Sequence, residues 1–352
     1  MRSLVELKNN NNLYGYTNWR YKALLILIIG FFAILIVGFI GLNFGTIIIQ
    51  PEKIWSIIWQ HQTDNSLGLI IWELRLPRLI MAMLAGMTLA SVGGSFQGML
   101  RNPLADPYIL GVSAGAALGA CLAIALQYTL KLYLIPYLPF FSLLGALISI
   151  ALVYLLSQKQ TRLSVSDLLL AGVAINFFFS AIITLLLATS KQGTHTMLFW
   201  LMGDLSTANW QKISWVILPV FLGTLLLISS SLELNAMALG EEEALHLGVQ
   251  TEKFRMKIFL IGSLMIALIV SFTGLIGFVG LVIPHIARLL VGPDHRIMLP
   301  VSALAGSVFL IICDTIARSL IAPIEIPIGA ITAILGAPFF IHLLKRRNNI
   351  NE

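Results

Sequence analysis

The sequence contains very little charge for its length. Asp, Glu, Lys and Arg together make up 11% of its 352 residues, whereas 58% are hydrophobic and the mean hydropathy is +0.91. A water-soluble domain of this size needs many more charged residues to keep its surface hydrated. The composition therefore excludes a soluble protein. The net charge of +6 reflects the distribution of basic residues between membrane loops and gives no support for nucleic-acid binding.

The sequence also lacks the residue patterns of a disulfide-linked protein, of a P-loop ATPase and of an ion-driven carrier. Cys121 and Cys313 are the two cysteines, and both lie inside apolar runs, which indicates small core residues and no disulfide framework. No lysine in the chain follows a glycine, so the Walker-A phosphate loop is absent and the chain cannot itself be a P-loop ATPase. The apolar runs also lack the acidic relay expected of a proton- or sodium-driven carrier.

What the sequence does contain is a series of apolar runs that approach or exceed the ~20 residues needed to cross a bilayer. We therefore expect an all-α, polytopic membrane protein with about ten transmembrane helices, and a short additional helix around 51–60. The expected spans are 23–42, 77–99, 108–127, 138–156, 166–189, 213–231, 256–272, 275–290, 299–320 and 327–344.

The spans form one transmembrane domain, 23–345, between an N-terminal tail at 1–22 and a C-terminal tail at 346–352. An even number of spans places both tails on one side of the membrane. Most of the 22 basic residues then lie on that side, so both tails are expected to be cytoplasmic. Small residues recur at every fourth position in the second and third spans, which predicts close helix packing. These positions are Ala82, Gly86, Ala90, Gly94, Gly98, Gly111, Gly115 and Gly119.

The loop at 232–255 interrupts the apolar pattern with a dense cluster of charge. Its sequence predicts one short helix over 238–247, because Glu241–Glu243 fall in a first turn and Gly248 is suited to end the helix. A solvated linker is the plainer interpretation. The apolar side chains in so short a helix favour a docking element instead, since exposed apolar patches usually meet a partner. These side chains are Leu239, Ala244, Leu245 and Leu247.

Four further polar residues need an interpretation. Asn176, deep in the fifth span, either lines a path or bridges helices. Ser113 lies in a G-x-S-x-G pattern that fits a hydrolase nucleophile, but it opens a membrane helix rather than following a strand. Asp314 and Arg318 are four residues apart on one helix face and predict a local ion pair.

Six long motifs occur in a fixed order along the chain. They are LRLPRLIMAMLAGMTLASVGG (74–94), RNPLADPYILGVSAGAALG (101–119), SDLLLAGVAIN (166–176), NAMALGEEEALHLGV (235–249), GLIGFVGLVIPHIARLLVGPDHR (274–296) and EIPIGAITAILGAPFFIHLL (325–344). The set resembles the permease subunits of ABC importers for iron complexes and vitamin B12. The first 70 residues and the segment 190–212 match less closely.

The resemblance implies a fold like that of the vitamin B12 importer permease, in the plasma (inner) membrane of a prokaryote. The subunit would pair with a second permease, identical or related, and with two ABC ATPase subunits that use ATP and Mg. An external substrate-binding protein would deliver the cargo, and the subunit itself would bind lipid but no cofactor, metal or nucleic acid. A ferric siderophore is the expected cargo, with cobalamin or haem as alternatives. An ion-coupled secondary transporter is the alternative from another class.

The resemblance also implies roles for particular residues, and none of them is catalytic. The ATPase-coupling residues would be Ala238, Leu239, Gly240, Glu241, Ala244, Leu245, Leu247 and Gly248. The cytoplasmic gate would comprise Asn102, Leu104, Ser164 and Val165. Docking of the binding protein would use Arg75, Arg78 and Arg318, whose forked donors suit partner carboxylates. Alternatively, these arginines anchor span ends at the lipid headgroups.

Overall fold

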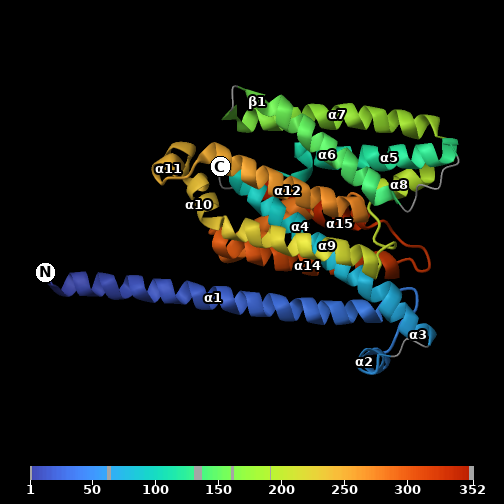
Figure 1. Ribbon diagram of the computed structural model, residues 1–352. Helices are drawn as coiled ribbons and strands as arrows, with labels where there is room; N and C mark the ends of the chain where they lie inside the picture. Colours follow the sequence, from blue (N-terminus) through green and yellow to red (C-terminus); the bar gives the residue numbers. More distant parts are fainter. Residues whose placement is uncertain (1, 62–64, 131–136, 160–161, 191, 349–352) are drawn as a thin grey trace.

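The computed structural model describes the chain except for residues 1, 62–64, 131–136, 160–161, 191 and 349–352 (Figure 1). Eight helical stretches are long and apolar enough to cross a membrane, and two shorter apolar helices, α13 and α15, accompany them. Together they correspond to the ten predicted spans. The spanning helices are α1 (Arg2–Asn43), α4 (Leu76–Met99), α5 (Val112–Leu130), α6 (Leu138–Ser157), α7 (Val165–Thr189), α9 (Trp210–Ser229), α12 (Thr251–Thr273), α13 (Val279–Val291), α14 (His295–Ser319) and α15 (Ile328–Asn348).

Short elements connect the spans. They are α2 (Pro51–Trp59), α3 (Ser66–Leu69), the π-helical turn η1 (Ile70–Arg75), the 3₁₀ turn η2 (Pro107–Leu110), α8 (Thr194–Leu201), α10 (Ser231–Leu239) and α11 (Glu241–His246). The predicted helix around 51–60 is confirmed as α2. The strands β1 (Gln158–Lys159) and β2 (Arg162–Leu163) form a small antiparallel pair between α6 and α7, in which Gln158 faces Leu163. The fold of the described chain is thus all-α apart from this pair.

Helix α4 lies at the centre of the bundle, between α14, α12, α13 and α9 (Figure 1). Its apolar window is 83% buried, because its small residues allow neighbouring backbones to approach. A Cβ atom on Gly86 would lie 2.1 Å from the carbonyl oxygen of Gly306 in α14. Likewise, a Cβ atom on Gly115 of α5 would lie 2.5 Å from the carbonyl oxygen of Gly145 in α6. The close packing predicted from the small residues is therefore confirmed at these two crossings.

Helix α1 has the opposite environment. Its apolar stretch, Leu24–Asn43, is only 11% buried, and its main neighbour is α14. In Figure 1 it lies along one edge of the bundle. The helix begins at Arg2, so it also covers most of the range predicted as the N-terminal tail. At the other terminus, α15 runs to Asn348, and the last four residues of the predicted C-terminal tail lie outside the described residues.

The two ends of the bundle carry different polar clusters. Helices α10 and α11 lie where α4 finishes and α14 begins, and this end is called the α11 end (Figure 1). The opposite end, where α4 begins and α14 finishes, holds Arg78 and is called the Arg78 end. Helix α1 begins and α15 finishes at the α11 end, as an even number of spans requires.

Candidate functional site

The charged loop folds as two short helices rather than one. Helix α10 ends at Leu239 and α11 begins at Glu241, with Gly240 between them at φ +149°. Because L side chains rarely adopt this φ, the turn favours glycine. The prediction of a single helix over 238–247 is therefore wrong, because Gly240 breaks the helix after Leu239.

The end of α11 agrees with the sequence prediction. Gly248 adopts φ +85°, and its N–H donates to the carbonyl oxygen of Leu245 at 2.9 Å. The N–H of Val249 donates to the carbonyl oxygen of Ala244 at 3.0 Å. This pair of bonds is the Schellman arrangement, in which glycine in the left-handed region closes the last helical turn. Gly248 is thus confirmed as the helix stop.

The apolar side chains of this loop point in two directions. Ala244 is fully buried against the bundle, whereas Leu239, Leu245 and Leu247 are 68%, 54% and 64% exposed. Ala244 therefore holds α11 in place and does not belong to the exposed surface. The three leucines form a patch, the α11 leucine patch, that the described part of the chain leaves uncovered. A hollow of about 630 Å³ beside the patch is lined by Leu247 and by residues of α10 and α12.

An ion pair connects α11 to the spanning helix α12. The Nη2 atom of Arg255 in α12 donates to the Oε2 atom of Glu241 at 3.1 Å. The Arg255 side chain is 4% exposed and that of Glu241 is 50% exposed. Glu241 is thus oriented by a cation inside its own chain, in addition to its position in the first turn of α11.

A second connection joins α10 to the start of α14. The Nδ2 atom of Asn235 donates to the Oδ1 atom of Asp294 at 2.7 Å, and the N–H of His295 donates to the Oδ1 atom of Asn235 at 2.9 Å. Asp294 also caps α14 by accepting from the N–H of Arg296. The Arg296 guanidinium, bonded to this carboxylate, lowers the pKa of Asp294 from 3.8 to about 2. Asn235 and Asp294 were not among the predicted site residues, although an aspartate directly before a helix is a recognisable N-cap signal.

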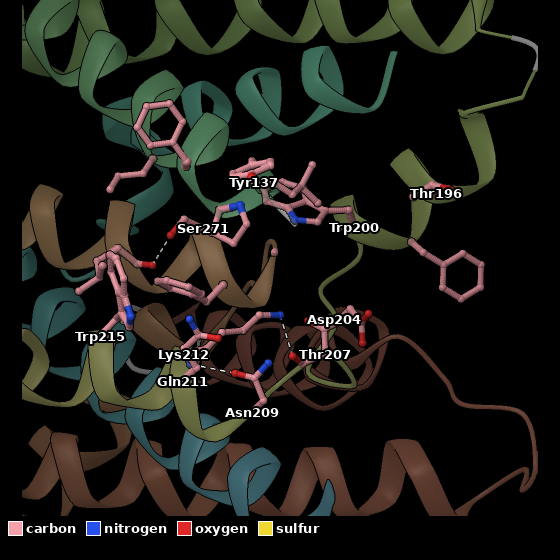
Figure 2. A pocket seen from close by; sticks show the side chains of 18 residues that line it. Tyr137, Thr196, Trp200, Asp204, Thr207, Asn209, Gln211, Lys212, Trp215 and Ser271 are labelled. Carbon is pink, nitrogen blue, oxygen red and sulfur yellow. Dashed lines mark hydrogen bonds between the residues drawn. The ribbon is translucent and has the colours of Figure 1, made fainter. Parts of the chain in front are cut away.

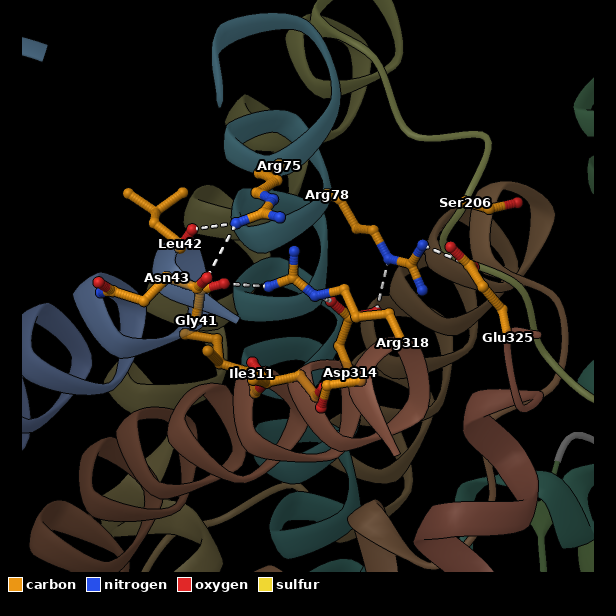
Figure 3. A network of polar contacts seen from close by, with 12 residues as sticks. Gly41, Leu42, Asn43, Arg75, Arg78, Ser206, Ile311, Asp314, Arg318 and Glu325 are labelled. Atoms are coloured by element: carbon orange, nitrogen blue, oxygen red, sulfur yellow. Dashed lines mark hydrogen bonds and ion pairs between the residues drawn. The ribbon is translucent and has the colours of Figure 1, made fainter. Parts of the chain in front are cut away.

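The Arg78 end contains a buried network of arginines and carboxylates (Figure 3). The Nε atom of Arg78 donates to the Oδ1 atom of Asp314 at 2.7 Å, and its Nη1 atom donates to the Oε2 atom of Glu325 at 2.8 Å. The Nε atom of Arg318 lies 3.4 Å from the Oδ2 atom of Asp314, which confirms the predicted i,i+4 pair. One carboxylate on α14 thus serves two arginines, one from its own helix and one from α4.

The remaining donors of this cluster bind the backbone at the end of α1. Arg75 donates to the carbonyl oxygens of Leu42, Asn43 and Ile47, and Arg318 donates to that of Gly41. These bonds satisfy carbonyl groups that a helix end leaves without intrahelical partners. The network therefore fastens α1 to α4 and α14.

The three arginines assigned to docking are buried. Arg75, Arg78 and Arg318 are 5%, 9% and 5% exposed, and each donates hydrogen bonds within the chain. Arginines that dock a partner need accessible donors, and headgroup anchors need side chains that reach the bilayer surface. The end of α1 covers Arg75 and Arg318, and Asp314 and Glu325 bind Arg78, so this geometry favours neither role and both stay predictions.

Asn176 bridges helices, which was one of its two predicted roles. Its Nδ2 atom donates to the carbonyl oxygens of Tyr108 and Ile109 at 3.1 and 3.2 Å, and so joins α7 to η2. The Tyr108 hydroxyl in turn donates to the carbonyl oxygen of Ile276 at 2.7 Å and accepts from the N–H of Ile276 at 2.8 Å. Tyr108, which the sequence did not single out, therefore holds the extended segment between α12 and α13.

The predicted gate residues lie at the α11 end, in two turns. Asn102 and Leu104 are exposed in the segment after α4, where the Oδ1 atom of Asn102 accepts from the N–H of Leu104 at 2.9 Å. Ser164 caps α7, its Oγ atom accepting from the N–H of Asp167 at 3.0 Å, and Val165 is the half-buried first residue of that helix. Both turns are accessible starting points for structural change, but the structure of one chain does not test a gating role.

Two other kinds of site receive no structural support. The Ser113 hydroxyl is buried in α5 and has no hydrogen-bond partner among the described residues, whereas a hydrolytic serine needs a base beside it. Within the described ranges, no group of three or more His, Cys, Asp and Glu side chains could hold a metal ion. The candidate functional features are therefore the α11 leucine patch, the arginine network and helix α14, which runs from one end of the bundle to the other.

Comparisons with known proteins agree with this architecture. An uncharacterised ABC transporter permease protein, YvrB of Bacillus subtilis, is 41% identical over 98% of this chain and 96% of its own length. The cobalamin import permease BtuC of Halobacterium salinarum is 40% identical over 82% of this chain and 76% of its own. The iron(3+)-hydroxamate import permease FhuG of Bacillus subtilis is 36% identical over 93% and 98%.

A solved structure described as an inward-facing conformation of a metal-chelate type ABC transporter superposes with a TM-score of 0.79. It is 34% identical, and the match covers 91% of this chain and 99% of that one. The agreement thus extends over nearly the whole length of both chains. The family model matches residues 33–346, and the chain belongs to the FecCD transport family, a family of ABC transporter permeases.

Proposed function

We propose that this chain is the permease subunit of an ATP-driven importer and that its cargo is a ferric siderophore. The observation that carries the proposal is the α11 leucine patch. Three exposed leucines lie at the charged α11 end of a chain whose sequence has no phosphate loop. ATP hydrolysis then belongs to a separate ABC ATPase subunit, with its own ATP and Mg, that covers the patch.

The proposed transmission runs along α14. A displacement of α11 by the ATPase would move α10, and the hydrogen bond between Asn235 and Asp294 would transmit this movement to the start of α14. The path from Asp294 to Asp314 covers twenty residues, or about 30 Å of helix. At the far end Asp314 holds Arg78 of α4, so movement of α14 is coupled to the Arg78 end. Packed helices with discrete contacts at both ends are suited to rigid-body shifts of this kind.

Orientation follows from the basic residues at the two ends. The α11 end carries a larger set of cations, which favours its placement in the cytoplasm of a prokaryotic cell, with the protein in the plasma membrane. These residues are Arg101, Lys253, Arg255, Lys257, Arg288 and Arg296. The Arg78 end is then external and receives a substrate-binding protein. Because the three arginines are engaged, that partner would meet other residues of this end.

The complete transporter would contain two permease subunits, identical or related, and two ATPase subunits. In such an assembly the turns holding Leu104 and Val165 would face the cytoplasm and close the path between cargo deliveries. Iron complexes are the preferred cargo because FhuG is named for iron(3+)-hydroxamate and the similar solved structure for metal chelates. Cobalamin is the alternative, because BtuC is equally similar to this chain.

The test is to substitute the α11 leucine patch in the transporter reconstituted with its ATPase and binding protein. Leu245→Asp or Leu247→Asp would place a charge in a buried contact, and a central contact of this type is worth ~2 kcal/mol or more. Uptake of a radiolabelled ferric siderophore should therefore fall at least about tenfold, and ATPase association should weaken. Leu290→Asp, an equally drastic change at another exposed leucine of the α11 end, serves as the matched control.

Normal uptake by both leucine variants would refute the coupling role and show that α11 is only a linker between spans. Competition between ferric siderophore, haem and cobalamin in the same vesicles identifies the cargo independently. Uptake of haem or cobalamin without uptake of the siderophore would shift the proposal to those compounds without affecting the coupling argument.

A further inference from the structure

A cavity of about 690 Å³ opens at the Arg78 end, and none of the three arginines of the network lines it (Figure 2). Its walls come from the first turns of α6 and α9, the last turns of α12, helix α8 and the segment between α8 and α9. The volume lies within the ~300–1,000 Å³ typical of sites that enclose a small organic ligand. None of the features discussed above uses this cavity.

The deeper wall of the cavity is apolar and aromatic. Leu143 of α6 and Leu268 and Phe272 of α12 line it, and they lie within the spanning segments. Trp215 lies five residues inside α9 from its first residue, which is about 7–8 Å along the helix. Phe140 and Trp215, which also line the cavity, are 62% and 67% exposed, so its apolar wall continues onto the outer surface of the spanning helices, which faces the bilayer.

The opposite wall is polar and carries one charge of each sign. Among the eighteen lining side chains, Asp204 and Lys212 are the charged ones, and Figure 2 shows them on the same side of the cavity. The Nζ atom of Lys212 donates to the carbonyl oxygen of Thr207 at 2.7 Å, which leaves further ammonium hydrogens for a ligand. The Oδ1 atom of Asp204 accepts from the N–H of Ser206 at 2.7 Å, and its other oxygen has no hydrogen-bond partner among the described residues.

The height of the polar wall corresponds to the bilayer surface. Lys212 is the third residue of α9, and Tyr137 and Trp210 lie at the starts of α6 and α9. Aromatic side chains with a polar tip concentrate at the headgroup level of membranes. The cavity therefore begins at the headgroup level and continues into the acyl-chain region.

We propose that this cavity binds one zwitterionic phospholipid with a primary ammonium headgroup, taken from the adjacent leaflet. Its phosphate contacts Lys212, its ammonium contacts Asp204, and one acyl chain runs between Trp215, Leu143 and Leu268. A neutral pair of opposite charges matches a neutral headgroup with the same two charges, whereas an anionic lipid would leave its extra charge facing Asp204. Because the apolar wall continues onto the surface that faces the bilayer, this ligand is available without passage through water. The proposal does not depend on the cargo or on ATPase coupling.

The test measures lipids retained by the full-length protein after extraction in mild detergent, by native mass spectrometry. The protein is equilibrated with equal amounts of phosphatidylethanolamine and phosphatidylglycerol of identical chains. The wild type should retain one phosphatidylethanolamine in preference to phosphatidylglycerol by about tenfold, the factor that corresponds to one charge-assisted hydrogen bond.

Two single substitutions make the test specific. Asp204→Asn keeps the acceptor for Ser206 but leaves the cavity with a single positive charge, so its preference should change to phosphatidylglycerol. Leu143→Trp fills the apolar part and should reduce retention of both lipids. Glu52→Gln, which removes an exposed carboxylate on α2 at the same end, is the matched control and should behave like the wild type.

An equal retention of the two lipids by the wild type would overturn the proposal. So would an unchanged preference in Asp204→Asn, or full retention in Leu143→Trp by a variant with wild-type thermal stability. If Leu143→Trp fails to fold, the change of preference in Asp204→Asn still decides the matter, because that substitution keeps the local hydrogen bond.

Discussion

The arginine network allows a substitution whose cost can be worked out from its contacts. The change is Asp314→Asn, which preserves the shape of the side chain and removes its negative charge. The Asp314 side chain is 2% exposed and faces Arg78 at 2.7 Å and Arg318 at 3.4 Å. The variant therefore leaves buried Arg78 paired only with the partly exposed carboxylate of Glu325, and buried Arg318 without an ion pair among the described residues.

Removal of one partner from a buried ion pair costs about 3–5 kcal/mol, because the other charge remains desolvated. We expect Asp314→Asn to lower the free energy of unfolding by an amount in this range. Glu325→Gln is the matched comparison, since it removes the same charge from the same arginine at 2.8 Å. Its side chain is 41% exposed, so solvent screens the pair and the expected loss is about 0–1 kcal/mol.

The assay is unfolding of the purified full-length protein in mixed micelles with increasing sodium dodecyl sulfate. The double variant Asp314→Asn/Arg78→Met completes a mutant cycle, and it should lose less stability than the sum of its single variants, by about 0.5–3 kcal/mol. Equal losses for Asp314→Asn and Glu325→Gln would refute the reasoning. The same result would follow if the network were hydrated rather than buried.

Three further outcomes are expected. Tyr108→Phe leaves the N–H and the carbonyl oxygen of buried Ile276 without partners, and should cost about 1–3 kcal/mol per group in the same unfolding assay, whereas Tyr128→Phe, at an exposed hydroxyl, should be close to neutral. The lowered pKa of Asp294 means that its stabilising contribution is complete above pH 3.8 and disappears as the pH falls through about 2. Thermal stability measured over this range should therefore show a component that Asp294→Asn lacks. Cysteines introduced at Leu104 or at the start of α7 should crosslink across a permease pair in one nucleotide state only, and crosslinking independent of nucleotide would remove these turns from the gate.

The spans themselves could be predicted because their signal is local. A run of about 20 apolar residues must form a helix in the bilayer, whatever its neighbours are, since each backbone polar group needs a partner within the helix. The prediction that Gly248 ends α11 was also correct because its signal is local: the position after the last helical turn favours the left-handed conformation, which glycine adopts readily. The i,i+4 pair of Asp314 and Arg318 was likewise a property of one helix.

The contacts that the sequence did not reveal depend on which helices are neighbours. Arg78 reaches Asp314 across 236 positions of sequence, and no local pattern shows that α4 lies against α14. The end of α1 covers Arg75 and Arg318 and makes them internal. Ala244 looked like part of an exposed apolar face, but the direction of α11 turns it toward the bundle.

The sequence alone thus determined the class of protein, the places of the apolar helices and the position of the charged loop. Each of these rests on composition or on neighbours within one helix turn. The tertiary structure decided which charges are buried, which leucines are left uncovered and where a cavity with two opposite charges opens. Burial and ion pairing are sums over contacts between distant segments, and only the packing of the helices determines those contacts.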